Sequence, residues 1–64
     1  MDVQIVRAWI RNMKPGETLS LHASTEIEFR EIENIFYQVS AEFSEKGWRL
    51  SLSQSNSTVI CTCH

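Results

Sequence analysis

The chain is 64 residues long, so we expect one domain, spanning residues 1–64, with a small core. Its hydrophobic content of 42% is sufficient for a compact fold, and its formal net charge is only −2. It has no apolar run of about 18 residues that would cross a membrane, and its N-terminus lacks the pattern of a secretory signal. Its two cysteines are two positions apart, which does not suit a disulfide framework. We therefore expect a cytoplasmic protein with reduced thiols.

Residues 2–13 are predicted to form a short helix. Asp2 is suited to the N-cap, where its carboxylate would accept hydrogen bonds from free backbone amides. The helix should end at residues 14–16, Lys-Pro-Gly, because proline cannot continue it and glycine provides the turn. Apolar side chains recur along it at a near-helical spacing, at Val3, Val6, Ile10 and Met13.

Residues 17–23 are predicted to form a strand that is buried on one side. The alternation has a period of two, which is typical of a half-buried strand. The apolar positions are Leu19, Leu21 and Ala23, and the polar positions between them are Thr18, Ser20 and His22.

Residues 25–47 are predicted to form a long amphipathic helix around which the rest of the chain folds. Thr25 and Glu28 have the spacing of a capping box, in which a hydroxyl and a carboxylate satisfy free backbone amides. Gly47 is suited to the left-handed residue that follows a helix. One face carries apolar side chains at the helical period: Phe29, Ile32, Ile35, Phe36, Val39 and Phe43.

Two strands are predicted to close the chain, at residues 48–53 and 58–63, joined by a polar turn at residues 54–57. A tight turn centred on residues 55–56 would place six apolar side chains on one face, in the pairs Leu52–Val59, Leu50–Cys61 and Trp48–Cys63. A shift of one residue would expose both cysteines, so we prefer the first register.

The predicted order of elements, α-β-α-β-β, favours an α+β domain of two layers. Two helices would pack on one face of a three-stranded sheet. If the first two strands are neighbours, the long helix is a right-handed crossover between parallel strands. The last two strands form an antiparallel hairpin, so the sheet would be mixed.

The long helix is acidic, which makes its outer face the first candidate for function. On a helical wheel Tyr37 lies nearly opposite the apolar stripe, and an exposed tyrosine among charged residues is typical of an interface anchor. Acidic helices can also dock on basic protein surfaces. A solvated face without a partner is the simpler interpretation. We expect a non-enzymatic interaction protein with an interface at Glu26, Arg30, Glu33, Tyr37 and Glu45.

The outer face of the predicted sheet is a second candidate interface, because it is rich in hydroxyl groups and open unless a partner covers it. Homodimer formation is a further option for a domain with so small a core. The residues of this face are Thr18, Ser20, His22, Arg49, Ser51, Ser53, Thr58, Ile60 and Thr62.

The alternative function is a small nucleic-acid-binding regulator that uses the basic N-terminal segment. Phosphate contacts require a basic stripe, and Arg7, Arg11 and Lys14 are the candidates. The long helix shows no helix-turn-helix break, and its glutamates would be repelled by phosphate. We therefore expect nucleic acid to be the less favoured partner.

No catalytic or cofactor motif is recognisable, and we expect neither enzymatic activity nor a cofactor. The chain lacks a G-x-S-x-G elbow and a glycine-rich phosphate loop. Zinc is an alternative for the tail, where Cys61, Cys63 and His64 could act together with His22. Structural zinc sites normally space their cysteines more widely, so we favour buried structural thiols.

The segment KPGET, at residues 14–18, resembles a turn found in a loose group of short phage and prophage proteins. In that group a first helix leads through K-P-G-E-[ST] into a strand, a helix and a closing hairpin. The tail Thr62-Cys63-His64 departs from the usual ending of the group. The resemblance implies a phage-type accessory protein. Small acidic proteins of this kind often inhibit host machinery such as CRISPR effectors, restriction enzymes or RNA polymerase, in the host cytoplasm.

Overall fold

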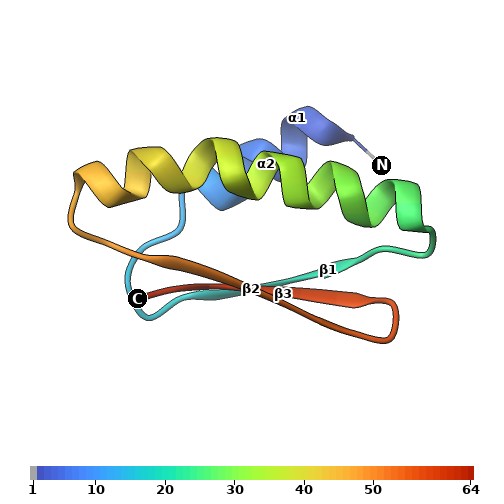
Figure 1. The fold of residues 1–64 in the computed structure, drawn as a ribbon. Helices are drawn as coiled ribbons and strands as arrows, with labels where there is room; N and C mark the ends of the chain where they lie inside the picture. The colour runs from blue at the N-terminus through green and yellow to red at the C-terminus, as the bar shows by residue number, and fades with distance from the viewer. Residues whose placement is uncertain (1) are drawn as a thin grey trace.

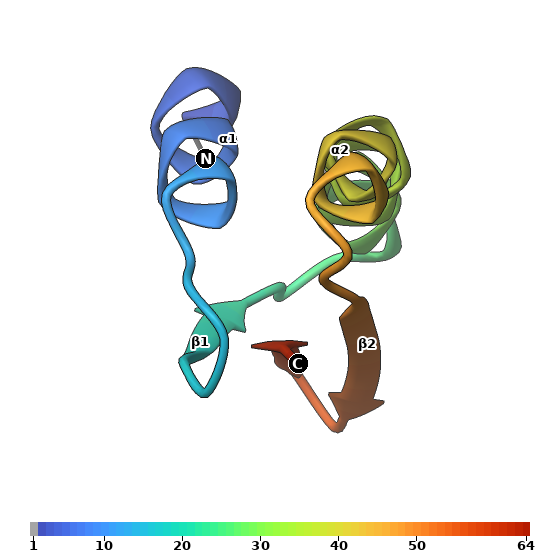
Figure 2. The same ribbon diagram turned by 90° about the vertical axis from the view of Figure 1, so that its left-hand side faces the viewer.

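The structure, a computed structural model, describes residues 2–64. Its elements in chain order are α1 (Val3–Arg11), β1 (Thr18–His22), α2 (Glu26–Glu45), β2 (Leu50–Ser55) and β3 (Thr58–Cys63). The helices lie side by side over one face of the sheet (Figure 1). Viewed along the helices, α1 lies over β1 and α2 lies over β2 (Figure 2).

The sheet has the strand order β1-β3-β2 and is antiparallel throughout. The prediction of an α+β domain is confirmed, and the prediction of a mixed sheet is wrong. β1 and β2 run in the same direction, but β3 lies between them, so the crossover through α2 joins strands that are not neighbours. The physical reason is burial. β3 has the most deeply buried side chains of the sheet, Val59, Cys61 and Cys63, and the central position covers it on both edges.

The hairpin between β2 and β3 is paired two residues away from the predicted register. The observed pairs are Leu50–Cys63, Leu52–Cys61 and Gln54–Val59. β2 continues through Ser55, and the turn follows at Asn56, whose backbone has a positive φ of 55°. Asparagine tolerates this left-handed conformation better than serine does. A shift of two residues leaves every side chain on its predicted face, so the hydrophobic pattern could not detect it.

α1 begins and ends close to the predicted positions. Asp2 is its N-cap, and the Oδ1 atom accepts hydrogen bonds from the amides of Gln4 at 3.0 Å and Ile5 at 3.3 Å. The helix ends at Arg11, two residues earlier than predicted. Met13 lies beyond the helix but is still buried in the core.

α2 is the longest element, and its two ends have the predicted signals in part. The hydroxyl half of the capping box is present, whereas the Glu28 carboxylate accepts from the hydroxyls of Ser24 and Thr25 and not from the amide of Thr25. The Oγ1 atom of Thr25 accepts from the amide of Glu28 at 3.2 Å. Gly47 has φ 78°, and its amide donates to the Ser44 carbonyl at 3.0 Å. The predicted inner stripe is buried, except that Phe29 is half-buried at its edge. Within residues 2–64, neither helix is both long and apolar enough to cross a membrane.

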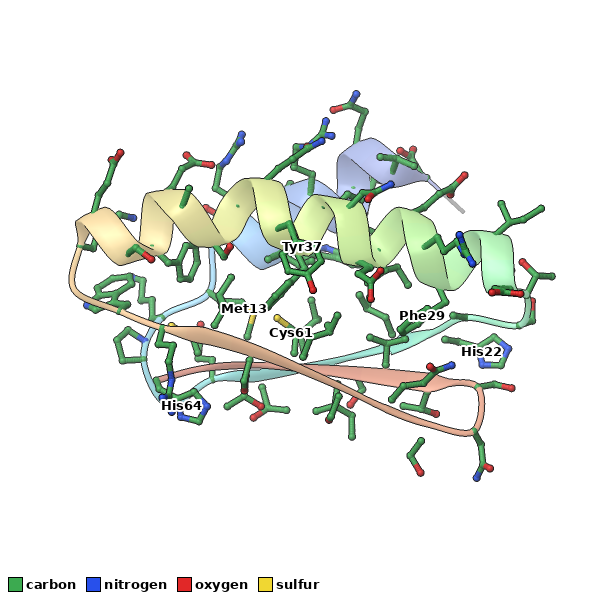
Figure 3. All side chains as sticks on the ribbon, in the orientation of Figure 1. Met13, His22, Phe29, Tyr37, Cys61 and His64 are labelled. Carbon is green, nitrogen blue, oxygen red and sulfur yellow. The ribbon has the colours of Figure 1, made fainter. Side chains whose placement is uncertain are left out.

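The core fills the space between the helices and the sheet. Figure 3 shows Met13 and Cys61 in this layer. α1 contributes Val6 and Ile10, which are also buried. Trp48 was predicted to begin a strand. It instead packs on Phe43 just after the helix, with ring centroids 5.9 Å apart.

Candidate functional site

The outer face of α2 presents Tyr37 to solvent. The side chain of Tyr37 is 64% exposed, and its ring projects from the front of the helix in Figure 3. The ring contacts Phe36 edge to face, with centroids 5.4 Å apart and planes at 71°. Because Phe36 is itself buried, one edge of the tyrosine ring rests on the core while the remainder is available for contact.

Glu26, Arg30 and Glu33 line up with Tyr37 along the helix, as predicted. Arg30 Nη2 and Glu26 Oε1 are 3.0 Å apart in an exposed ion pair at the i, i+4 spacing. Glu33 is half-buried, and it has no ion-pair partner within residues 2–64. Part of the acidity of this face is therefore neutralised on the helix itself, whereas Glu33, one turn before Tyr37, has no ion-pair partner among the described residues.

Glu45 does not share this stripe. It lies eight positions after Tyr37, which is about 80° around an α-helix of 3.6 residues per turn. It is exposed at the C-terminal end of α2. We therefore define the Tyr37 face by Glu26, Arg30, Glu33 and Tyr37.

The basic residues of α1 form contacts with α2 and do not make a separate basic stripe. Arg7 Nη2 donates to Gln38 Oε1 at 3.1 Å. Arg11 is paired with Glu42, with 3.1 Å between Nη2 and Oε2. These contacts join the two helices along their outer seam. Lys14 is exposed in the loop after α1. Of the predicted nucleic-acid-binding residues, Arg7 and Arg11 therefore contact α2, whereas Lys14 lies apart from them in solvent.

The outer face of the sheet has the predicted polar residues in register. Cross-strand rows run Thr18–Thr62–Ser51, Ser20–Ile60–Ser53 and His22–Thr58–Ser55. His22 and His64 lie at opposite ends of the sheet in Figure 3. His64 is paired with Arg49 through backbone hydrogen bonds of 2.7 and 3.1 Å. Its Nε2 atom lies 3.0 Å from Ser51 Oγ.

The cysteines lie on the other side of the sheet from these histidines. Both thiols are buried in the core. Burial raises the pKa of Cys61 to about 11, with a smaller contribution from Cys63. Burial and the nearby Glu17 carboxylate raise the pKa of Cys63. Residues 2–64 contain no cluster of three or more His, Cys, Asp or Glu side chains that could hold a metal ion.

The structure also contains an apolar groove that the sequence interpretation missed. It is open, has a volume of about 560 Å³, and runs between the end of α1 and the outer edge of β1. We call it the α1–β1 groove; it is lined by Trp9, Asn12, Met13, Glu17, Thr18, Leu19 and Ser20. Trp9 gave a signal for it, because this large apolar side chain lies off the buried stripe of α1.

No protein-family model matches this chain, and comparisons with the curated proteins and with the solved structures found no match. The resemblance at residues 14–18 therefore stays a prediction.

Proposed function

We propose that this chain is a protein-interaction module that acts by binding and not by catalysis. The observation that carries the proposal is the 64% exposure of Tyr37 on the outer face of α2. An aromatic side chain in this position adds little to the core, which α2 builds from its opposite side. Tyrosine is enriched among the few residues that dominate the binding energy of protein interfaces.

The charges beside Tyr37 favour a basic partner surface. Glu33 has no internal partner among the described residues, and Glu26 is exposed to solvent. Opposite charge on a partner would steer the encounter and set the orientation of binding, while Tyr37 would supply contact area.

The resemblance at residues 14–18 supports a more specific form of the proposal, a phage-type accessory protein that inhibits a host protein. The host surface that fits this form is a basic groove that binds nucleic acid, because carboxylates can occupy the positions of phosphates. Inhibition would then result from competition with nucleic acid for that groove.

A capture experiment with two matched double variants tests the interface. Tagged wild-type protein is used to capture its partner from host extract, and the affinity is then measured with the purified partner. Glu33→Lys combined with Tyr37→Ala should weaken binding by at least about tenfold. Glu45→Lys combined with Ile27→Ala makes the same change of charge and removes another exposed apolar side chain. It should bind as wild type does, because both residues lie about 80° around the helix from Tyr37.

Equal binding by wild type and both double variants would contradict the Tyr37 face. A Ser53→Lys variant would then test the outer face of the sheet, where Ser53 is exposed. Loss of nucleic acid from the partner when the wild-type protein is added would support the competitive form of inhibition.

A further inference from the structure

β1 is an edge strand whose outer side is unpaired within residues 2–64. Its inner side is fixed by two hydrogen bonds, from the amide of Cys63 to the Glu17 carbonyl at 3.0 Å and from the amide of Ala23 to the Ser57 carbonyl at 2.7 Å. In an antiparallel ladder, successive residues direct their backbone groups to opposite edges. The N–H and C=O groups of Thr18, Ser20 and His22 therefore point away from β3, and they are available to another strand.

This free edge lies beside the α1–β1 groove. Trp9 is 53% exposed and forms one wall, while Leu19 is half-buried on the β1 side. A strand paired with β1 would place alternate side chains on the helix side of the sheet, next to Trp9 and Met13. The backbone groups of β1 and the apolar groove would then act on the same ligand.

We propose that the α1–β1 groove binds an extended peptide segment of a partner protein by strand addition to β1. Main-chain hydrogen bonds to Thr18, Ser20 and His22 supply affinity, and the groove selects side chains, as in other cases of β-augmentation. An apolar side chain of the peptide packs between Trp9 and Leu19. Among the described residues, Glu17 alone is a charged residue that lines the groove, so a basic side chain next to the apolar one completes the charge match.

A second copy of this chain is a poor occupant of the same edge. α1 lies over β1 (Figure 2), so an antiparallel two-fold pairing of β1 with its copy would bring two α1 helices about one strand spacing apart. Neighbouring strands are about 4.8 Å apart, whereas packed helices need about 8–10 Å between their axes. α2 covers β2 in the same way. A peptide segment that has no helix layer of its own avoids this clash.

Peptide selection provides the test. A library of random decamer peptides is panned against the wild-type protein, and the tightest binder is measured by fluorescence anisotropy. Trp9→Ala should weaken its binding by at least about tenfold. Glu17→Gln should weaken it about two- to fivefold, the range of an exposed charge pair. Ile27→Ala is the control, because Ile27 is 71% exposed and is not among the residues of the groove; it should have no effect.

Two measurements on the backbone separate strand addition from simple apolar contact. Amide exchange measured by NMR should slow at Thr18, Ser20 and His22 when the peptide is added. Ser20→Pro should abolish binding and leave the circular dichroism unchanged, because this N–H is not used in the ladder to β3 and proline is tolerated in edge strands.

Three results would overturn the proposal. One is a set of selected peptides whose binding does not depend on Trp9, and another is unchanged amide exchange along β1 in the complex. The third concerns the free protein: amide exchange at Thr18, Ser20 and His22 that becomes slower as the protein concentration rises. A second copy would then occupy the edge. The Tyr37 double variant should bind the peptide normally, so this test and the test of the Tyr37 face can fail independently.

Discussion

Cys61 and Cys63 show how the environment of single residues controls their chemistry. Both thiols belong to the core cluster and are almost inaccessible to solvent. Burial disfavours a thiolate, so the pKa of Cys61 rises to about 11. The thiolate is the reactive form of cysteine. Both cysteines should therefore behave as small apolar side chains at neutral pH and react slowly with thiol reagents.

The raised pKa of Cys61 makes stability depend on pH on the alkaline side. In the unfolded chain the thiol ionises near pH 9, so its contribution to the stability of the fold is complete below that pH. The contribution is lost as pH rises toward about 11. We expect the free energy of unfolding, measured with urea, to fall by about 3 kcal/mol over this window. Cys61→Ala is the control for lysine and tyrosine ionisation, and an equally steep fall in that variant would contradict the assignment.

At the scale of elements, α2 carries its own start and stop signals. The Glu28 carboxylate accepts from the hydroxyl of Ser24 at 2.7 Å, and Thr25 Oγ1 accepts from the Glu28 amide. The Ser24 hydrogen bond is the main cause of a lowered pKa at Glu28. This hydrogen bond contributes to the stability of the fold above the ordinary pKa of glutamate. The contribution is lost as pH falls through the lowered pKa of Glu28. At the other end, the Trp48 amide donates to the Phe43 carbonyl at 3.0 Å and closes the helix.

Removing the N-cap hydroxyl of α2 should be measurable. Thr25→Ala leaves the Glu28 amide without its partner, and loss of such a cap costs about 1 kcal/mol. Thr25→Ser keeps a hydroxyl in the same place and should remain close to wild type. Urea denaturation of the three proteins checks this prediction, and equal midpoints would show that the cap is not used.

At the scale of the whole molecule, a small core joins two helices to one sheet. Ile10 of α1 is fully buried, and it belongs to the same cluster as Ile32 of α2 and Val59 of β3. A domain of this size has a total stability of about 3–10 kcal/mol. Each buried side chain therefore accounts for a large share of the free energy of unfolding.

Ile10→Ala should lower the free energy of unfolding by about 2–5 kcal/mol, the usual cost of such a truncation in a packed core. Ile5→Ala makes the same chemical change one turn and a half earlier on α1. Ile5 is 46% exposed, so that variant should stay within about 0.5 kcal/mol of wild type. Urea denaturation of both variants makes the comparison. Similar losses of unfolding free energy would contradict the orientation of α1 that places Ile10 in the core and Ile5 at the surface.

The sequence was informative about most features that depend on nearby residues. Three features of the helices could be predicted, because capping and helical periodicity act within a few positions. They are the N-caps Asp2 and Thr25, the left-handed Gly47 after α2 and the buried stripe of α2. The composition of the outer sheet face followed from alternation. Tyr37, Glu26, Arg30 and Glu33 could be grouped from the helical wheel alone. The predicted interface also included Glu45, although the same wheel places Glu45 about 80° from Tyr37.

Only the tertiary structure decided how the strands are ordered and paired. β1 and β2 have similar alternating patterns, and backbone hydrogen bonds carry no side-chain signature that tells which strand lies beside β3. A register shift of two residues also keeps every side chain on its own face. The α1–β1 groove depends on the same arrangement, because Trp9 and Leu19 are distant in sequence and meet only when α1 lies over an edge strand. The sequence by itself therefore determined the elements and their buried faces, and long-range packing decided the strand order, the hairpin register and the groove.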